Sequence, residues 1–201
     1  MEIGNSKPPP ELVLGRVYES VKFDSLVLPN RDVSRAEFSR CTFTKCRMDG
    51  LMANGAIFED CSFIDCDISN ASILGTRFID CKFVGSKLLG WKWPDARQPV
   101  LMSLRNCHCG ECSFYGMQLK KYSMVECNFK NADFAEAKLV SSNLAGSDFS
   151  GARFHDSDLS HSDFSTARNY NIDARVNVIR KAKFSLPEAI SLLEGLDVTL
   201  V

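Results

Sequence analysis

Large apolar residues recur at every fifth position along most of this chain. One series runs from Phe23 to Trp93, a second runs from Leu104 to Phe164, and 13 of the 14 phenylalanines lie on them. Two residues before each of these central positions stands a further series of mostly small residues, chiefly Ala, Ser and Cys. Asp, Asn, Lys, Arg and Ser occupy most of the positions between. The pattern predicts two inward-facing positions in every five residues.

A period of five fits neither an α-helix nor a flat strand. On a helix, five residues advance about 500°, so the apolar series would spread around the axis. On a strand, an odd step places alternate members on opposite faces. All central positions point inward if the chain turns a right-angled corner after every five residues, which closes a square coil in about 20 residues. Cys41, Cys61 and Cys81 recur at this interval. We therefore predict an all-β solenoid of about seven coils, stacked about 4.8 Å apart.

The apolar series slips by one residue between Trp93 and Leu104. The intervening segment contains two prolines, and proline cannot donate a hydrogen bond to a strand ladder. We expect an N-terminal tail at 1–20, a first array at 21–93, an inter-array loop at 94–101, a second array at 102–167 and a C-terminal cap at 168–201. The loop is either a repaired insertion or a projection that contacts a partner. In the second case the contact residues are Trp93, Pro94, Asp95, Arg97 and Pro99.

The repeat pattern ends after Ala167. Asp173 is a candidate N-cap for a short helix that continues through Ala182, and Ser185 has capping-box spacing to Glu188 at the start of a second helix. Residues 196–201 are expected to form a terminal strand. A solenoid needs a cover for its last coil, so this segment is a cap, and it is also a candidate dimer interface. The residues predicted for dimerisation are Leu186, Ile190, Leu193, Leu196, Val198 and Leu200.

Charge is unevenly distributed, although the formal net charge is −1. This near neutrality gives no basic footprint for nucleic-acid binding. Residues 126–165 hold seven acids and three bases, which favours an electropositive partner at that end of the rod. Alternatively, Asp before a central position suits the turn of the repeat and is merely solvated. The acids predicted to contact a partner are Asp133, Glu136, Asp148, Asp156, Asp158 and Asp163.

The cluster at 107–112 is the strongest candidate for chemistry, because three cysteines and a histidine could bind zinc. However, Cys107 and Cys112 occupy the small inward positions and Cys109 is a central position, where cysteine behaves as a buried apolar residue. His155 and His161 face outward without a nucleophile beside them. We therefore predict no metal, no cofactor and no enzymatic activity. The odd cysteine count and the lack of an export signal indicate a reducing cytoplasm.

Several quintets resemble a known repeat family. The runs at 132–136, 142–146, 147–151 and 157–161 (ADFAE, SNLAG, SDFSG and SDLSH) are similar to the A(D/N)LXX signature of pentapeptide-repeat proteins. The resemblance covers about residues 21–167. It implies a right-handed quadrilateral β-helix, here with a short α-helical C-terminal cap. It says little about function, because one fold hosts many functions.

Four further segments, at 91–94, 112–116, 124–127 and 182–189, resemble the topoisomerase-protecting branch of that family, which includes albicidin-immunity, quinolone-resistance and microcin-immunity proteins. The resemblance implies a homodimeric rod that binds DNA gyrase or topoisomerase IV and shields it from poisons, partly by mimicking DNA. The nearly neutral net charge does not fit mimicry of DNA along the full length of the rod. Binding to the enzyme through a local patch is an equal alternative. The rival interpretation is a generic scaffold for an unrelated partner.

Overall fold

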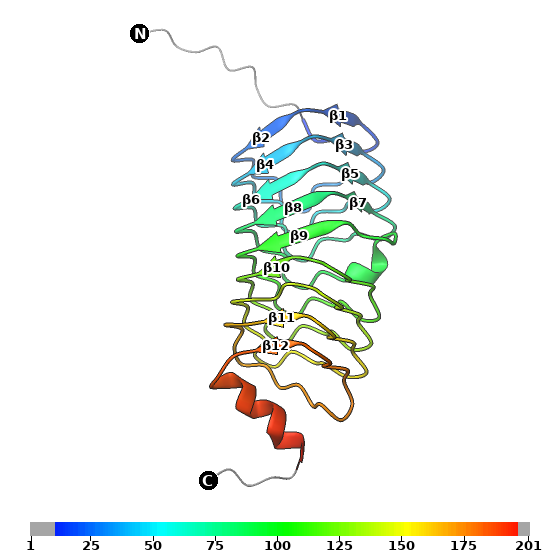
Figure 1. The fold of residues 1–201 in the computed structure, drawn as a ribbon. Helices are drawn as coiled ribbons and strands as arrows, with labels where there is room; N and C mark the ends of the chain where they lie inside the picture. Colours follow the sequence, from blue (N-terminus) through cyan, green and yellow to red (C-terminus); the bar gives the residue numbers. More distant parts are fainter. Residues whose placement is uncertain (1–10, 197–201) are drawn as a thin grey trace, which may run out of the picture.

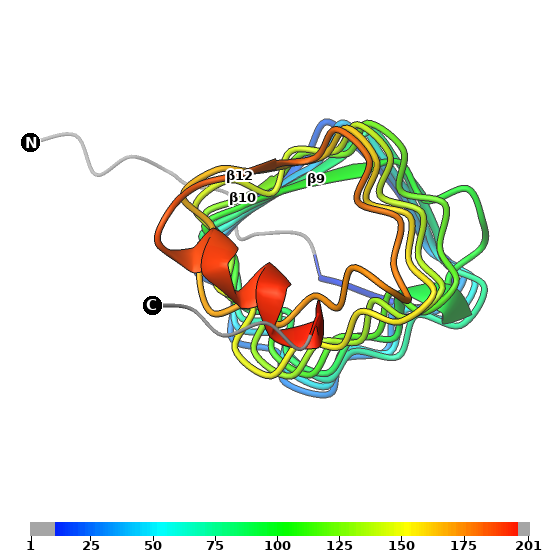
Figure 2. The same ribbon diagram turned by 60° about the horizontal axis from the view of Figure 1, so that its bottom comes forward.

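The computed structural model describes residues 11–196 as a four-sided rod of stacked coils, with the chain winding around one long axis (Figures 1 and 2). Strands in successive coils pair in parallel and in register, usually with residues 20 apart, as Phe43 pairs with Phe63. Across the inter-array loop the interval is 21, as between Phe83 and Leu104 and between Lys87 and His108, and then it returns to 20. The predicted four-sided β-solenoid is confirmed.

Short strands form ladders along the rod. One sheet contains β1 (Val17–Glu19), β3 (Glu37–Ser39), β5 (Ile57–Glu59) and β7 (Arg77–Ile79). A second contains β2 (Lys22–Asp24), β4 (Thr42–Thr44), β6 (Ser62–Ile64), β8 (Cys81–Val84), β9 (Met102–Arg105) and β10 (Met124–Val125). The strands β11 (Asp163–Phe164) and β12 (Lys183–Phe184) pair near the C-terminal end. Isolated parallel bridges continue the pairing on the remaining sides.

We name the four sides of the rod by their central residues. Side A has Tyr18, Phe38, Phe58, Phe78, Leu119, Leu139, Leu159 and Ile179. Side B has Phe23, Phe43, Phe63, Phe83, Leu104, Met124, Leu144, Phe164 and Phe184. Side C has Leu28, Met48, Ile68, Leu88, Cys109, Phe129 and Phe149. Side D has Val33, Ala53, Ile73, Trp93, Phe114, Phe134 and Phe154.

The core is a set of aromatic stacks that run along the axis. On side B the ring of Phe43 lies 4.7 Å from Phe23 and 4.7 Å from Phe63, centroid to centroid, with nearly parallel planes. Rings on neighbouring sides meet edge to face, as Phe58 and Phe63 do at 5.5 Å. Both arrangements are favourable for aromatic pairs. Four five-residue units per coil therefore place a central residue on the central residue of the previous coil, so that consecutive phenylalanines on one side stack.

The small inward residues have a second role besides fitting the narrow interior. Most of their sulfhydryls and hydroxyls donate a hydrogen bond to the carbonyl of a central residue in the coil before, whereas Cys107 and Cys127 donate to Arg105 and Val125 in their own coil. Cys66 Sγ reaches the carbonyl of Phe43 at 3.4 Å, and Ser157 Oγ reaches that of Phe134 at 2.8 Å. A buried carbonyl left without a partner would be costly. This explains why Ser and Cys recur at these positions.

The corners are made by the residue two positions after each central residue. These residues adopt the left-handed region, as Asn70 and Asn131 do with φ of 56° and 57°. Asn, Asp and Gly tolerate this conformation best. At Gly151 a Cβ atom would also lie 2.4 Å from Oδ1 of Asn131 in the preceding coil, so a side chain there would clash.

The coil extends beyond the arrays expected from the sequence at both ends. Within the expected N-terminal tail, Tyr18 already stacks on Phe38 at 4.8 Å. At the other end, the helix expected between Asp173 and Ala182 is absent, because this segment completes another coil. Asn177 takes the small inward position there, and its amide nitrogen donates to the carbonyl of Phe154 at 3.2 Å.

The chain then forms the helix η2 (Glu188–Leu196), which lies across the open end of the last coil (Figures 1 and 2). It is a 3-10 helix, so the prediction of an α-helical cap is wrong in helix type. Its attachment includes Ser191, whose hydroxyl donates to the carbonyl of Tyr170 at 3.2 Å, and Leu192, which packs against the core. The expected strand at 196–201 lies outside the described residues except for Leu196.

Candidate partner-binding surfaces

The inter-array loop projects sideways from the rod (Figures 1 and 2). It starts with the short helix η1 (Trp93–Asp95). Trp93 itself is fully buried and packs 4.9 Å from Trp91, so it cannot be a contact residue in the folded protein. Ala96 and Val100 are also buried and fix the loop to the coil. The other predicted loop contacts, Pro94, Asp95, Arg97 and Pro99, are exposed.

A groove of about 360 Å³ separates this loop from the next coil. Its lining residues are Pro94, Gln98, Pro99, Tyr115, Gly116, Met117 and Gln118. The loop wall is held by Gln98, whose amide nitrogen donates to the carbonyls of Trp93 and Ala96 at 3.3 and 3.2 Å. Tyr115 forms the other rim and is 45% exposed. An apolar side chain from another molecule would lose water on entering this groove.

The strand ladder on side A is interrupted at the groove. In the regular coils the amide before each side-A centre donates to the coil above, as Lys138 donates to the carbonyl of Met117 at 2.9 Å. The equivalent amide of Gln118 has no hydrogen-bond partner within residues 11–196. The preceding position on side A belongs to the inter-array loop, where one extra residue interrupts the regular backbone. Gln118, whose amide has no partner among the described residues, also lines the groove.

The six acids predicted to contact a partner do not form one surface. Asp158 lies on side A, Asp163 on side B, Asp148 on side C and Asp133 on side D. Glu136 and Asp156 occupy successive positions at the corner between sides D and A, because the amide of Glu136 bonds to the carbonyl before Asp156. The structure therefore brings two of the six together.

Three of these acids are also neutralised by a base one coil further on. Arg153 makes two hydrogen bonds to Asp133, at 2.7 and 3.0 Å. Arg168 lies 3.0 Å from Asp148, and the Lys183 ammonium lies 3.7 Å from Asp163. Partial burial raises the pKa of Asp148, but hydrogen bonds from Asn169, Ser150 and Arg168 outweigh it and lower the pKa to about 2. The nearby bases largely cancel the field of these three acids.

Apolar side chains remain exposed at the C-terminal end. Leu186 is 78% exposed, and Ile190, Leu193 and Leu196 are 44%, 37% and 48% exposed. The first precedes η2 and the others lie on it. Val198 and Leu200, the other two predicted dimerisation residues, lie outside the described residues. The described part of the cap thus leaves apolar side chains exposed at the C-terminal end of the rod.

The cysteine cluster at 107–112 belongs to the core. Cys107, Cys109 and Cys112 are buried, whereas His108 points outward from side C. Burial raises the pKa of the Cys109 thiol, so it is protonated at neutral pH and is a poor metal ligand. Within residues 11–196, no group of three His, Cys, Asp or Glu side chains is arranged to hold a metal ion.

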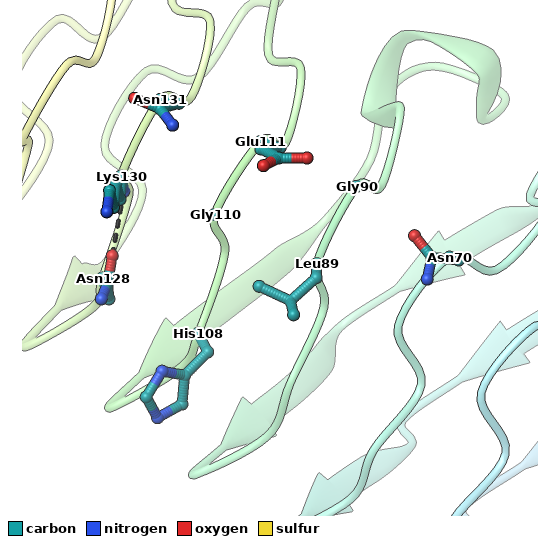
Figure 3. A pocket seen from close by; sticks show the side chains of 9 residues that line it. All are labelled: Asn70, Leu89, Gly90, His108, Gly110, Glu111, Asn128, Lys130 and Asn131. Atoms are coloured by element: carbon teal, nitrogen blue, oxygen red, sulfur yellow. Dashed lines mark hydrogen bonds between the residues drawn. The ribbon is translucent and has the colours of Figure 1, made fainter.

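A second depression, of about 410 Å³, lies on side C and was not predicted from the sequence (Figure 3). It is centred on Gly110, where the missing side chain leaves a gap between Leu89 and Lys130. His108 and Glu111 lie on either side of Gly110 in the chain. The depression is open and mixed in polarity, and its lining includes no Ser, Thr or Cys that could act as a nucleophile. The sequence feature that could have indicated this depression is Gly110, a glycine that does not occupy a corner position of the repeat.

No helix within residues 11–196 has the length and apolar character needed to cross a membrane.

Comparison with known proteins identifies the repeat. Residues 127–165 match the family model described as pentapeptide repeats, with eight copies. No curated protein matches this chain in sequence.

Solved structures share the fold over most of the chain. A trypsin-treated variant of QnrB1, described as a plasmid-mediated fluoroquinolone resistance protein, aligns with a TM-score of 0.79 and 20% identity, covering 94% of this chain and 98% of that one. A second QnrB1 variant gives 0.54 and 19%, covering 90% and 100%. HetL, which is involved in heterocyst differentiation regulation in the cyanobacterium Nostoc, gives 0.54 and 17%, covering 84% and 85%. Residues 127–165 therefore carry pentapeptide repeats, and the chain shares the fold of these solved structures over most of its length.

Proposed function

We propose that this protein is a non-catalytic factor that binds a type II DNA topoisomerase, DNA gyrase or topoisomerase IV, and protects it from a poison such as a fluoroquinolone, albicidin or microcin. The main support is the alignment, at a TM-score of 0.79 and over 98% of its chain, with a protein described as conferring fluoroquinolone resistance. The sequence motifs of the topoisomerase-protecting branch and the projecting mid-rod loop add to it. A sequence identity of 20% supports a shared fold alone. The topoisomerase-protecting activity of this protein is therefore our proposal.

The mode of binding that we favour is local contact through the loop. A rod that mimics DNA along its length would need a continuous acidic surface. In this protein Asp133, Asp148 and Asp163 point from three different sides and each is paired with a base. Any mimicry is thus restricted to a short patch, such as the corner that carries Glu136 and Asp156.

The test is gyrase supercoiling and topoisomerase IV decatenation, with and without the purified protein, across a fluoroquinolone, albicidin and microcin series. We expect activity to be rescued in the presence of at least one poison at near-stoichiometric protein. A heat-denatured sample and an unrelated β-solenoid protein serve as controls. If neither binding to the enzyme nor any change in its response to these poisons is seen, the proposal is wrong.

The second candidate function is a scaffold for an unrelated partner. It is favoured by the fact that HetL, a regulator of differentiation, has the same fold. In that case the topoisomerase assays would show neither rescue nor inhibition. Affinity capture with the full chain, compared with a variant whose loop is shortened, would then identify a partner that depends on the loop.

We further propose that the protein is a homodimer that associates through its C-terminal end. The exposed Leu193 and Leu196 on η2 would be buried in the interface. Replacing both by Glu is expected to give monomers in sedimentation, since charged groups would have to lose water on association. Leu74→Glu, which places the same charge at an exposed leucine on side D, is the control. A Leu193→Glu/Leu196→Glu protein that sediments like the control would place the interface elsewhere.

A further inference from the structure

Five cations gather on side A around the middle of the rod. Arg97 follows Arg77 in the side-A register, because the amide of Arg97 bonds to the carbonyl of Thr76. Lys138 lies two coils after Arg97 in the same register, because it pairs with Gln118 in the coil between them. Lys120 and Lys121 follow Leu119, the central residue of that intermediate coil. All five side chains are exposed. We call this set (Arg77, Arg97, Lys120, Lys121 and Lys138) the basic patch.

The basic patch forms no ion pair, whereas nine of the other 18 Lys and Arg side chains within residues 11–196 form one. Within residues 11–196, none of its five members has a carboxylate within 4.0 Å. The acids next to it, Asp80, Asp95, Glu136 and Asp158, stand at its edges. Glu136 already accepts a hydrogen bond from the Tyr115 hydroxyl at 2.5 Å. The patch therefore retains its positive field.

The residues that line the apolar groove are close neighbours of this patch in the sequence, although no patch residue lines the groove itself. Arg97 belongs to the loop wall segment, and Lys120 follows the groove residues Met117 and Gln118. Gln118 lines the groove and its amide has no partner among the described residues, so it offers one hydrogen-bond donor there. A cavity of about 360 Å³ has room for one large side chain and its neighbours, which is small for a ligand site.

From this juxtaposition we propose that side A is a docking surface for an acidic protein segment that carries one large apolar side chain. The apolar side chain enters the groove between Pro94, Pro99 and Tyr115. Carboxylates on either side of it lie against the basic patch, and a carbonyl or carboxylate oxygen accepts the hydrogen bond of the Gln118 amide. Opposite charge directs the approach, and the buried apolar anchor provides most of the affinity.

Charge and shape favour a protein segment over a nucleic acid. The calculated isoelectric point is 6.3, and the basic patch ends within about three coils, where Asp158 follows Lys138. A duplex would extend past this limit along negatively charged coils. An apolar groove beside the patch is also of little use for phosphate contacts. The inference goes beyond the proposed function, because it requires no particular partner and gives the rod a positive contact surface, opposite to that of a DNA mimic.

Amide NMR spectra of the full chain test the proposal with three heptapeptides: DEDFEDE, DEDAEDE without the apolar anchor, and KRKFKRK with the charge reversed. We expect DEDFEDE at about 1 mM to shift the amides of Gln118, Gly116 and Lys120 more than other amides. Replacing the Phe by Ala should weaken binding about tenfold, which corresponds to about 1.4 kcal/mol. The reversed peptide should not bind there.

Two matched variants locate the site. Lys120→Glu/Lys138→Glu should weaken DEDFEDE about tenfold or more and reduce its salt dependence, whereas Lys22→Glu/Lys82→Glu, the same charge change on side B, should have little effect. The spectrum of each free variant reports whether it is folded. The proposal is overturned if DEDFEDE causes no shifts on side A, if DEDAEDE binds equally well, or if a 12-base-pair duplex competes for the same amides with higher affinity. These outcomes do not depend on topoisomerase protection.

Discussion

The regular coils at 127–165 and the interrupted coil at 93–104 follow the same repeat with opposite results. In the regular coils each inward hydroxyl has a carbonyl to bond, and acids such as Asp133 and Asp148 are matched by a base 20 residues later. In the interrupted coil one extra residue pushes the loop outward, opens a groove and leaves the Gln118 amide without a partner. Strict repetition satisfies most of the buried polar groups internally. The place where repetition fails is therefore the place where we propose that another molecule binds.

The largest expected difference between the two regions is in stability. Phe134 lies in the regular stack, 4.7 Å from Phe114 and 5.2 Å from Phe154, and is fully buried. Phe134→Ala should lower the free energy of unfolding by about 3–5 kcal/mol, because it leaves a cavity between two fixed rings. Pro94→Ala, in the exposed loop, should change it by less than about 0.5 kcal/mol. Urea denaturation followed by circular dichroism measures both, and similar losses would contradict the separation of core from loop.

The two tryptophans of the interrupted coil sharpen the comparison. Both are buried, but Trp91 donates its indole N–H to the carbonyl of Ile68 at 2.6 Å, whereas the indole N–H of Trp93 has no partner within residues 11–196. Replacement by Phe removes a similar volume at each position. Trp91→Phe should therefore cost about 1–2 kcal/mol more than Trp93→Phe, because it leaves the Ile68 carbonyl unsatisfied. Equal losses would mean that the two indoles have equivalent environments.

Most of the fold could be predicted from the sequence, because a five-residue period has one simple geometric solution. Large residues at the centres and small ones two positions earlier report the two inward directions directly. The last coil was missed because Asn169 and Ala174 stand where central residues were expected, which hides Ile179 and Phe184. Packing against the preceding coil stabilises this last coil, although its sequence departs from the repeat. Asn177 provides the inward hydrogen bond that Ser provides elsewhere.

The candidate site was less accessible to prediction, since it depends on which residues share a side of the rod. Acids that are neighbours in the sequence, such as Asp156 and Asp158, point from a corner and a side, while partners such as Asp133 and Arg153 are 20 residues apart. A 20-residue comparison would have revealed these ion pairs. The basic patch is harder to recognise, because the extra residue in the loop shifts the interval across it.

The smallest expected effect concerns the paired acids of the regular coils. The pKa of Asp148 is lowered to about 2 in the folded protein, against about 3.9 in an unfolded chain. A lowered pKa means that its hydrogen bonds stabilise the fold at neutral pH and that this contribution is lost as the pH falls from about 4 to about 2. Asp148→Asn should thus lower the free energy of unfolding at pH 6 by less than about 1 kcal/mol, measured by urea denaturation. The difference in unfolding free energy from the natural protein should shrink at pH 2.5. Asp95→Asn in the loop, where the carboxylate makes no ion pair within the described residues, is the control and should show no such pH-dependent difference. If the Asp148→Asn difference is the same at both pH values, the hydrogen bonds and the ion pair of this carboxylate do not contribute to folding.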